Sequence, residues 1–171
     1  MRCTLASSTF LFITVTLCAY VCITIANEGN AAQAKPQAHT EENLCNIRDA
    51  WAPPSLNGAT LGVAYFTIES PQDNTILAAQ SPIAKTAELH THVKQGDIIQ
   101  MRKLNSVPVA ANMPLVFAPA GLHIMFYNIK RPLLDNTHFP LTISCANGGK
   151  VTTQVEVSQA RLLQAIKSRM Q

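Results

Sequence analysis

The sequence predicts an all-β sandwich that ends in a short helix. Segments rich in β-branched and aromatic residues recur at a spacing of roughly 8–12 residues, which is typical of sandwiches and barrels. Only the segment after Val157 has helical character. The chain has 171 residues, of which 47% are hydrophobic and 13% are charged, a composition that predicts one compact domain rather than a disordered chain.

The first 34 residues are expected to be a signal peptide. Arg2 precedes an uncharged apolar run over residues 9–26, which is the layout of a secretory signal. Cleavage is expected after the small-residue triplet Ala32-Gln33-Ala34. Because the run is longer than the usual stretch of about 7–15 apolar residues, an uncleaved N-terminal anchor is the alternative. In both cases the rest of the chain works outside the cytoplasm, and only this segment would contact the membrane.

Removal of the signal peptide would leave two of the five cysteines, Cys45 and Cys145. An even pair in an oxidising compartment predicts one disulfide between them. Two buried free thiols are the alternative.

The mature chain is expected to begin with a flexible lead-in over residues 35–44, which are polar and lack periodicity. The domain itself would span residues 45–157. The hairpin signal Asn147-Gly148-Gly149 joins its last two strands. The expected strands cover residues 60–69, 75–79, 87–93, 98–104, 115–118, 122–129, 138–145 and 151–157.

Residues 158–171 are expected to form the C-terminal helix. Ser158 is a good N-cap, and Lys167 and Arg169 suit the negative end of the helix dipole. A short apolar face predicts that the helix packs on the sandwich. That face consists of Leu162, Leu163 and Ile166.

Composition and motifs exclude several classes of function. The net charge is only +3, and no basic cluster is longer than a pair such as Lys130-Arg131, which argues against nucleic-acid binding. The nucleotide-binding, serine-hydrolase and zinc-protease motifs are absent from the sequence, and its carboxylates are scattered. The sequence therefore predicts no enzymatic activity.

His and Met residues gather in the middle of the chain. His90 and His92 are two positions apart, so on a strand their side chains share a face, and the same holds for His123 and Met125. Met101 lies on the strand expected between them. Thioether sulfur is soft and chiefly selects Cu(I), whereas zinc prefers thiolate and calcium or magnesium prefers oxygen. This cluster therefore predicts a Cu(I) site.

The spacing of His90, Met101, His123 and Met125 is H-x10-M-x21-H-x-M. This spacing resembles the signature of the PCu(A)C family of bacterial periplasmic copper chaperones. The resemblance covers roughly residues 47–157. It includes flanking segments at residues 49–54, 64–68, 121–125 and 130–133.

The resemblance implies a cupredoxin-like, Greek-key β-sandwich that binds one Cu(I) per chain through His90, Met101, His123 and Met125. It also implies a role in assembling the copper centre of cytochrome c oxidase. The recipient would be the subunit that holds this centre or a thiol-containing assembly protein. Family members often carry a Met near the first His, where this chain has His92, which is either an auxiliary ligand or a surface residue.

Two other functions are alternatives to a copper chaperone. An electron-transfer cupredoxin needs a Cys ligand beside its His and Met ligands, and neither Cys45 nor Cys145 is followed closely by a His. A secreted structural or adhesive β-sandwich with incidental His and Met residues is the alternative from a different class. Measured copper stoichiometry separates it from a chaperone.

Overall fold

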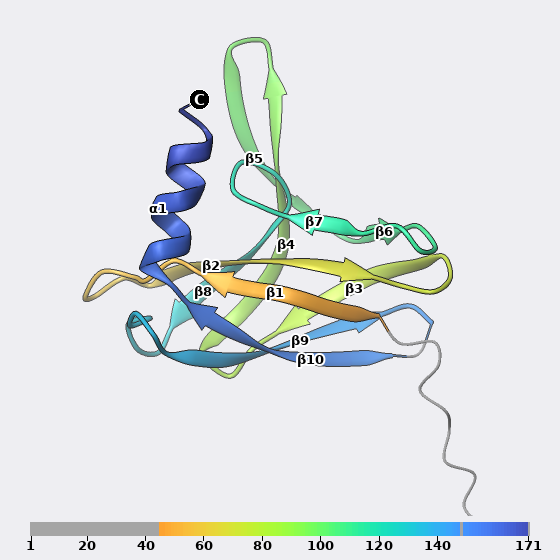
Figure 1. Cartoon of the computed structure of the whole chain (residues 1–171), viewed down its shortest axis with the longest axis horizontal. Coiled ribbons are helices and arrows are strands. Elements are labelled where there is room, and N and C mark those ends of the chain that lie inside the picture. The colour runs from red at the N-terminus through yellow and green to blue at the C-terminus, as the bar shows by residue number, and fades with distance from the viewer. Residues whose placement is uncertain (1–44, 148, 171) are drawn as a thin grey trace, which may run out of the picture. The chain divides into compact units, whose positions relative to one another are not determined.

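The computed structural model describes residues 45–147 and 149–170 (Figure 1). The expected signal peptide, its cleavage site and the expected lead-in lie outside these residues. Within the described part of the chain, no helix combines the length and the apolarity needed to cross a membrane.

Ten strands and one helix make up the described chain, in agreement with the predicted fold class. The strands found by residue pattern lie within a few residues of their expected ends. The elements are β1 (Asn46–Ala52), β2 (Leu61–Glu69), β3 (Asn74–Gln80), β4 (Ala84–Gln95), β5 (Ile98–Leu104), β6 (Val107–Val109), β7 (Leu115–Phe117), β8 (His123–Ile129), β9 (His138–Cys145), β10 (Lys150–Val157) and α1 (Gln159–Ser168).

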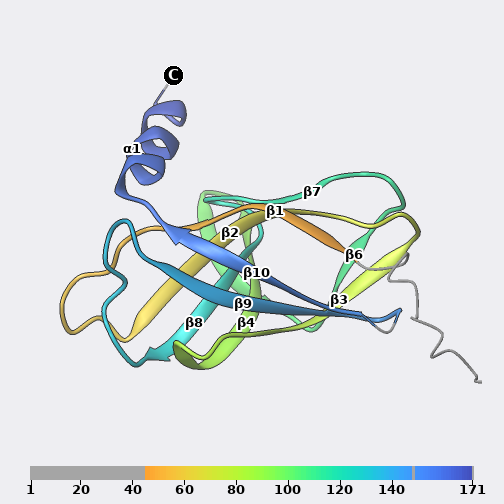
Figure 2. The same cartoon turned by 60° about the horizontal axis from the view of Figure 1, so that its bottom comes forward.

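The strands form one sheet in the order β5-β4-β8-β2-β1-β10-β9-β3-β6, and β7 pairs with β2. Because β3 also pairs with β4, through Ala79 and Ala87, the sheet curls round and closes on itself. β1 and β10 run parallel, whereas β4 is antiparallel to both β5 and β8. In the view of Figure 2, β9 and β10 lie in front of β8 and β4.

Alternate residues of the strands fill the interior, as the two-residue period of a strand requires. On β8 these are Ile124 and Phe126, and on β9 they are Leu141 and Ile143, all of which are fully buried. Phe66 of β2 stacks on Phe117 of β7, with ring centres 4.3 Å apart. On β8, the neighbours of Ile124 and Phe126 in the chain, such as His123 and Met125, therefore point to the opposite, outer face of the sheet.

Three strands differ from those expected from the residue pattern. β1 was not among the expected strands and was indicated only by the flanking segment at residues 49–54 of the family resemblance. β6 was not predicted, because a three-residue strand with Pro108 at its centre has no recognisable alternation. It exists because Val107 and Val109 pair with β3. β4 continues beyond both of its expected ends because β8 and β5 pair with different parts of it. Its far end forms a hairpin with β5 that extends beyond the rest of the sheet (Figure 1).

The helix begins where it was predicted, because the Ser158 side chain accepts a hydrogen bond from the backbone N–H of Arg161. The expectation that its apolar face packs on the sandwich is wrong. α1 has no buried residue, and Leu163 and Ile166 are 58% and 48% exposed. The Arg161 guanidinium attaches the helix instead, lying 5.7 Å from the centre of the Trp51 ring.

The sulfur atoms of Cys45 and Cys145 are bonded to each other. Both residues are buried, and the bond joins the chain just before β1 to the end of β9. The side-chain amide of Asn74 donates a hydrogen bond to the Cys45 sulfur at 3.5 Å.

Candidate metal centre

Strand pairing brings the predicted ligands together on one face of the sheet. β4 lies between β5 and β8, with His90 opposite His123 and His92 opposite Met101. Side chains of opposite residues share a face, and so do side chains two positions apart on one strand. Met125, two residues after His123, therefore lies on the same face. This face is the one opposite the core, because the intervening Ile124 is fully buried in the interior.

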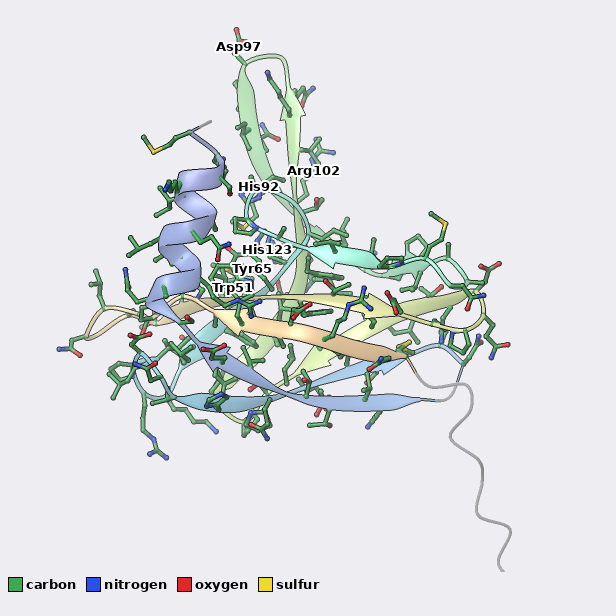
Figure 3. All side chains as sticks on the ribbon, in the orientation of Figure 1. Trp51, Tyr65, His92, Asp97, Arg102 and His123 are labelled. Carbon is green, nitrogen blue, oxygen red and sulfur yellow. A yellow bond between two sulfur atoms is a disulfide. The ribbon has the colours of Figure 1, made fainter. Side chains whose placement is uncertain are left out.

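The three imidazole rings form a cluster around His123. Its ring centre lies 5.0 Å from that of His92 and 5.9 Å from that of His90. Metal–nitrogen bonds of about 2 Å hold the ring centres of two imidazoles on one ion roughly 5–6 Å apart. Figure 3 shows His92 and His123 at the base of the β4–β5 hairpin. His123 is therefore close enough to share one ion with His90 or with His92.

Hydrogen bonds orient two of the rings. His123 Nδ1 lies 3.0 Å from the backbone oxygen of Gly121, and His90 Nε2 lies 3.0 Å from a carboxylate oxygen of Glu88. Since both oxygens can only accept, each of these ring nitrogens donates its proton. The other nitrogen of each ring, His123 Nε2 and His90 Nδ1, then carries a free lone pair. This is how outer groups select the tautomer of a metal-binding histidine.

The nitrogens with free lone pairs have no hydrogen-bond partner. His90 Nδ1, His92 Nδ1 and His123 Nε2 are all buried, and none has a protein partner. A buried polar atom without a partner costs free energy, roughly 1–3 kcal/mol. A soft metal ion bound between these rings would satisfy these atoms, so the residues present fit a metal.

The two methionines lie on either side of the His90–His123 pair in the strand register, Met101 opposite His92 and Met125 opposite Glu88. Met101 is 46% exposed on the edge strand β5, so one thioether is accessible from solvent. Met125 is half-buried and lines an apolar groove of about 250 Å³ that Pro54, Leu61 and Val63 also line. As the side chains stand, no three His, Cys, Asp or Glu residues of the described chain surround one metal position. A metal there would thus need the methionine sulfurs or a rotated ring.

The charges near the rings keep them suited to binding metal. Glu88 forms an ion pair with Lys103 at 2.6 Å, and hydrogen bonds from Lys103 and then His90 hold the pKa of Glu88 below its usual value. Burial lowers the pKa of His123, although the hydrogen bond to Gly121 partly opposes this effect. Because only the neutral imidazole binds a metal, a lowered pKa keeps His123 able to bind metal at lower pH.

Aromatic residues continue the same region of the outer surface. Trp51 and Tyr65 lie opposite each other on β1 and β2, with ring centres 4.9 Å apart. Burial raises the pKa of Tyr65, and the positive charge of Arg169 partly offsets this. Figure 3 shows both rings between His123 and the start of α1.

Sequence reasoning named all five His and Met residues of this face but missed Glu88 and Gly121. The position of Glu88, two residues before His90, was a usable signal, because it places the carboxylate on the same face of the strand. The role of Gly121 could not be read from the sequence, since its backbone oxygen and not a side chain holds His123. Away from this face, His138 lies on β9 and Met113 is exposed in a turn, whereas His39 is not among the residues that the structure describes.

A family model described as "Putative lipoprotein LpqE-like" matches residues 45–157. No curated protein matches the chain.

Solved structures of PCuAC domains share the fold of the described chain. The copper-bound PCuAC domain from PmoF2 matches with a TM-score of 0.56 and 16% identity, over 67% of this chain and 92% of that one. The apo PCuAC domain from PmoF1 matches with a TM-score of 0.55 and 15% identity, over 67% and 92%. Copper(I)-loaded DR1885 from Deinococcus radiodurans matches with a TM-score of 0.53 and 21% identity, over 69% and 81%. The expected cupredoxin-like fold is thus confirmed.

Proposed function

Because the chain belongs to the LpqE-like family, whose model spans its whole sheet, we propose that it is an extracytoplasmic chaperone that binds one Cu(I) and delivers it. His90, Met101, His123 and Met125 would be the ligands. The copper ion is cargo rather than a catalytic cofactor, so no reaction is catalysed.

One observation carries this proposal. Two buried imidazole nitrogens without hydrogen-bond partners, on His90 and His123, share a face with two thioethers. Thioether and imidazole are neutral ligands, and thioether sulfur selects Cu(I) among the common biological metals. That a copper-bound PCuAC domain and copper(I)-loaded DR1885 have the same fold supports this choice of ion.

Delivery requires that copper can leave. Met101 lies on the edge strand β5 and is half-exposed, so an incoming donor can reach the metal from that side. A thiolate binds Cu(I) more strongly than a thioether does and would replace Met101 first. His90 and His123 are buried and held by hydrogen bonds, and they would release the ion last. This order of exchange suits a recipient with thiol ligands, namely the copper-centre subunit of cytochrome c oxidase or a thiol-containing assembly protein.

The location outside the cytoplasm is part of the proposal. A disulfide between Cys45 and Cys145 is stable in an oxidising compartment. A site that uses methionine in place of cysteine for sulfur ligands cannot be lost there by disulfide formation. The apolar N-terminal run would direct the export.

The test is a Cu(I) titration of the exported protein against a competing chelator, followed by transfer to the isolated copper-centre domain of the oxidase. We expect one tightly held Cu(I) per chain and its loss to the recipient. If the wild-type chain held no Cu(I), the alternative of a structural or adhesive domain would replace the chaperone. If it held copper but did not transfer it, only the recipient would be wrong.

A further inference from the structure

His92 occupies a position that four-ligand Cu(I) binding does not explain. It lies opposite Met101, on the same face as His90 and His123. Its ring centre is 5.0 Å from that of His123, which is nearer than the ring of His90 at 5.9 Å. It is therefore as much a part of the imidazole cluster as the two histidines of the motif.

The contacts of His92 are those of a ligand rather than of a surface residue. A surface histidine directs its nitrogens to water or to a protein partner. The Nδ1 atom of His92 is instead buried and has no hydrogen-bond partner, as is the case for one nitrogen each of His90 and His123. Three such nitrogens therefore occur within one cluster.

We propose that His92 is a third imidazole ligand, and that His90, His92 and His123 together bind Cu(II) at the position proposed for Cu(I). This inference rests on the proposed function, since it assigns a second oxidation state of copper to the same site. The chain would thus bind copper in whichever state it arrives, without itself changing that state.

The donor chemistry separates the two ions. Cu(II) is harder than Cu(I) and is bound well by imidazole nitrogen, whereas thioether contributes little to its binding. With His92 the site offers three nitrogens, a sufficient core for Cu(II). Without His92 it offers two nitrogens and two sulfurs, which favours Cu(I).

Binding three rings to one ion requires a small rearrangement, because no three such donors surround one position as the side chains stand. His92 is the ring best able to turn. His90 and His123 are each held by a hydrogen bond and are 7% and 2% exposed, whereas His92 is only partly buried and its Nδ1 makes no hydrogen bond. Met101, across from it on the edge strand, is exposed and can move aside.

The charge at the site also favours a divalent ion. Glu88 lies two residues before His90 on the same face, and its carboxylate accepts a hydrogen bond from the His90 ring. A carboxylate behind a ligating histidine makes the ring a stronger donor and offsets part of the metal charge. That offset matters more for Cu(II) than for Cu(I).

The experiment compares the wild-type exported protein with His92→Gln in separate Cu(II) and Cu(I) titrations, with electron paramagnetic resonance of the Cu(II) forms. We expect nitrogen hyperfine structure from three imidazoles in the wild type and from two in His92→Gln. The affinity for Cu(II) should fall by about tenfold or more, since even the loss of an outer partner of a ligand costs 10–100-fold. The affinity for Cu(I) should change far less.

His138→Gln is the matched control, because His138 is an exposed histidine on β9 outside the cluster. It should leave both titrations unchanged, and circular dichroism should show that both variants are folded. The Met101→Leu/Met125→Leu double variant should show the reverse pattern and keep Cu(II) while losing Cu(I).

Three results would overturn the inference: an unchanged Cu(II) spectrum and affinity in His92→Gln, an equal loss in His138→Gln, or a wild-type protein that binds Cu(I) but not Cu(II). In the last case the chaperone function would stand and only the role of His92 would fail. A wild-type protein that bound neither ion would instead contradict the proposed function itself.

Discussion

His90 and His123 lie directly opposite each other on β4 and β8, with their ring centres 5.9 Å apart and one buried, unpartnered nitrogen on each ring. Each ring is held from behind, His90 by the Glu88 carboxylate and His123 by the Gly121 backbone oxygen. This pair is the centre of the candidate metal site, and the two methionines extend it on either side.

Replacing the two methionines should abolish Cu(I) binding while the fold survives. Met→Leu nearly conserves apolar volume, so each substitution should cost less than about 1.5 kcal/mol of unfolding free energy. Removing both sulfurs leaves only imidazole nitrogens, which hold Cu(I) more weakly than a ligand set that includes thioethers. Chelator competition on Met101→Leu/Met125→Leu measures the loss, and X-ray absorption of the wild-type Cu(I) form should show sulfur and nitrogen scattering.

Met113→Leu is the control, because Met113 is exposed in a turn outside the cluster. It should alter neither copper affinity nor stability. Should the double variant hold Cu(I) as tightly as the parent, the assignment of the sulfur ligands is wrong.

Glu88→Gln should weaken copper binding without removing a ligand. The amide oxygen can still accept the hydrogen bond from His90, but the negative charge and the ion pair with Lys103 are lost. Loss of such an outer partner typically costs 10–100-fold in metal affinity. The same titration on Glu156→Gln, a change on β10, should give the wild-type value. An unchanged affinity in Glu88→Gln would mean that the carboxylate does not act through His90.

The stability of the copper-free protein should fall as the pH drops below about 6.5, the usual pKa of histidine. The folded-state pKa of His123 is lowered, chiefly by burial. Between that lowered value and about 6.5 the unfolded chain binds more protons than the folded one, so stability rises with pH across this window. Urea unfolding at several pH values, compared with His123→Gln, measures the slope.

The wild-type slope across this window should be steeper than that of His123→Gln. Equal slopes would mean that His123 does not titrate differently in the folded and unfolded states.

The disulfide should account for a large part of the stability. The bond joins residues 100 positions apart, and the chain-entropy treatment of such a loop gives about 4–5 kcal/mol. Intact mass after alkylation, with and without reductant, counts the free thiols, and urea unfolding of the reduced protein measures the loss. Two alkylated cysteines in the unreduced exported protein would contradict the pairing of Cys45 with Cys145.

Export should produce a mature chain that starts at Lys35. The basis is the apolar run over residues 9–26 followed by the triplet Ala32-Gln33-Ala34. N-terminal sequencing of the exported protein decides between cleavage and an anchor. An intact Met1 in the membrane fraction would make the protein a membrane-anchored chaperone.

The sequence by itself determined the features that depend on local residue order. Runs of β-branched and aromatic residues bounded by turn residues placed β2, β5, β8 and β9 almost to their ends. The helix start followed from Ser158, since a cap acts on the backbone three residues away. The spacing of the His and Met residues selected the candidate ligands as a set.

Only the tertiary structure decided which side chains meet, because strand register and burial depend on contacts between distant segments. The pairing of β4 with both β8 and β5 places His92 against His123 and turns a residue that the sequence left undecided into a candidate ligand. β6 exists only because β3 pairs with it. The exposure of α1 has the same cause. A short apolar face is buried only where a complementary surface lies beside it. α1 instead contacts the sheet through Arg161, whose guanidinium lies over the Trp51 ring, and no residue of the helix is buried.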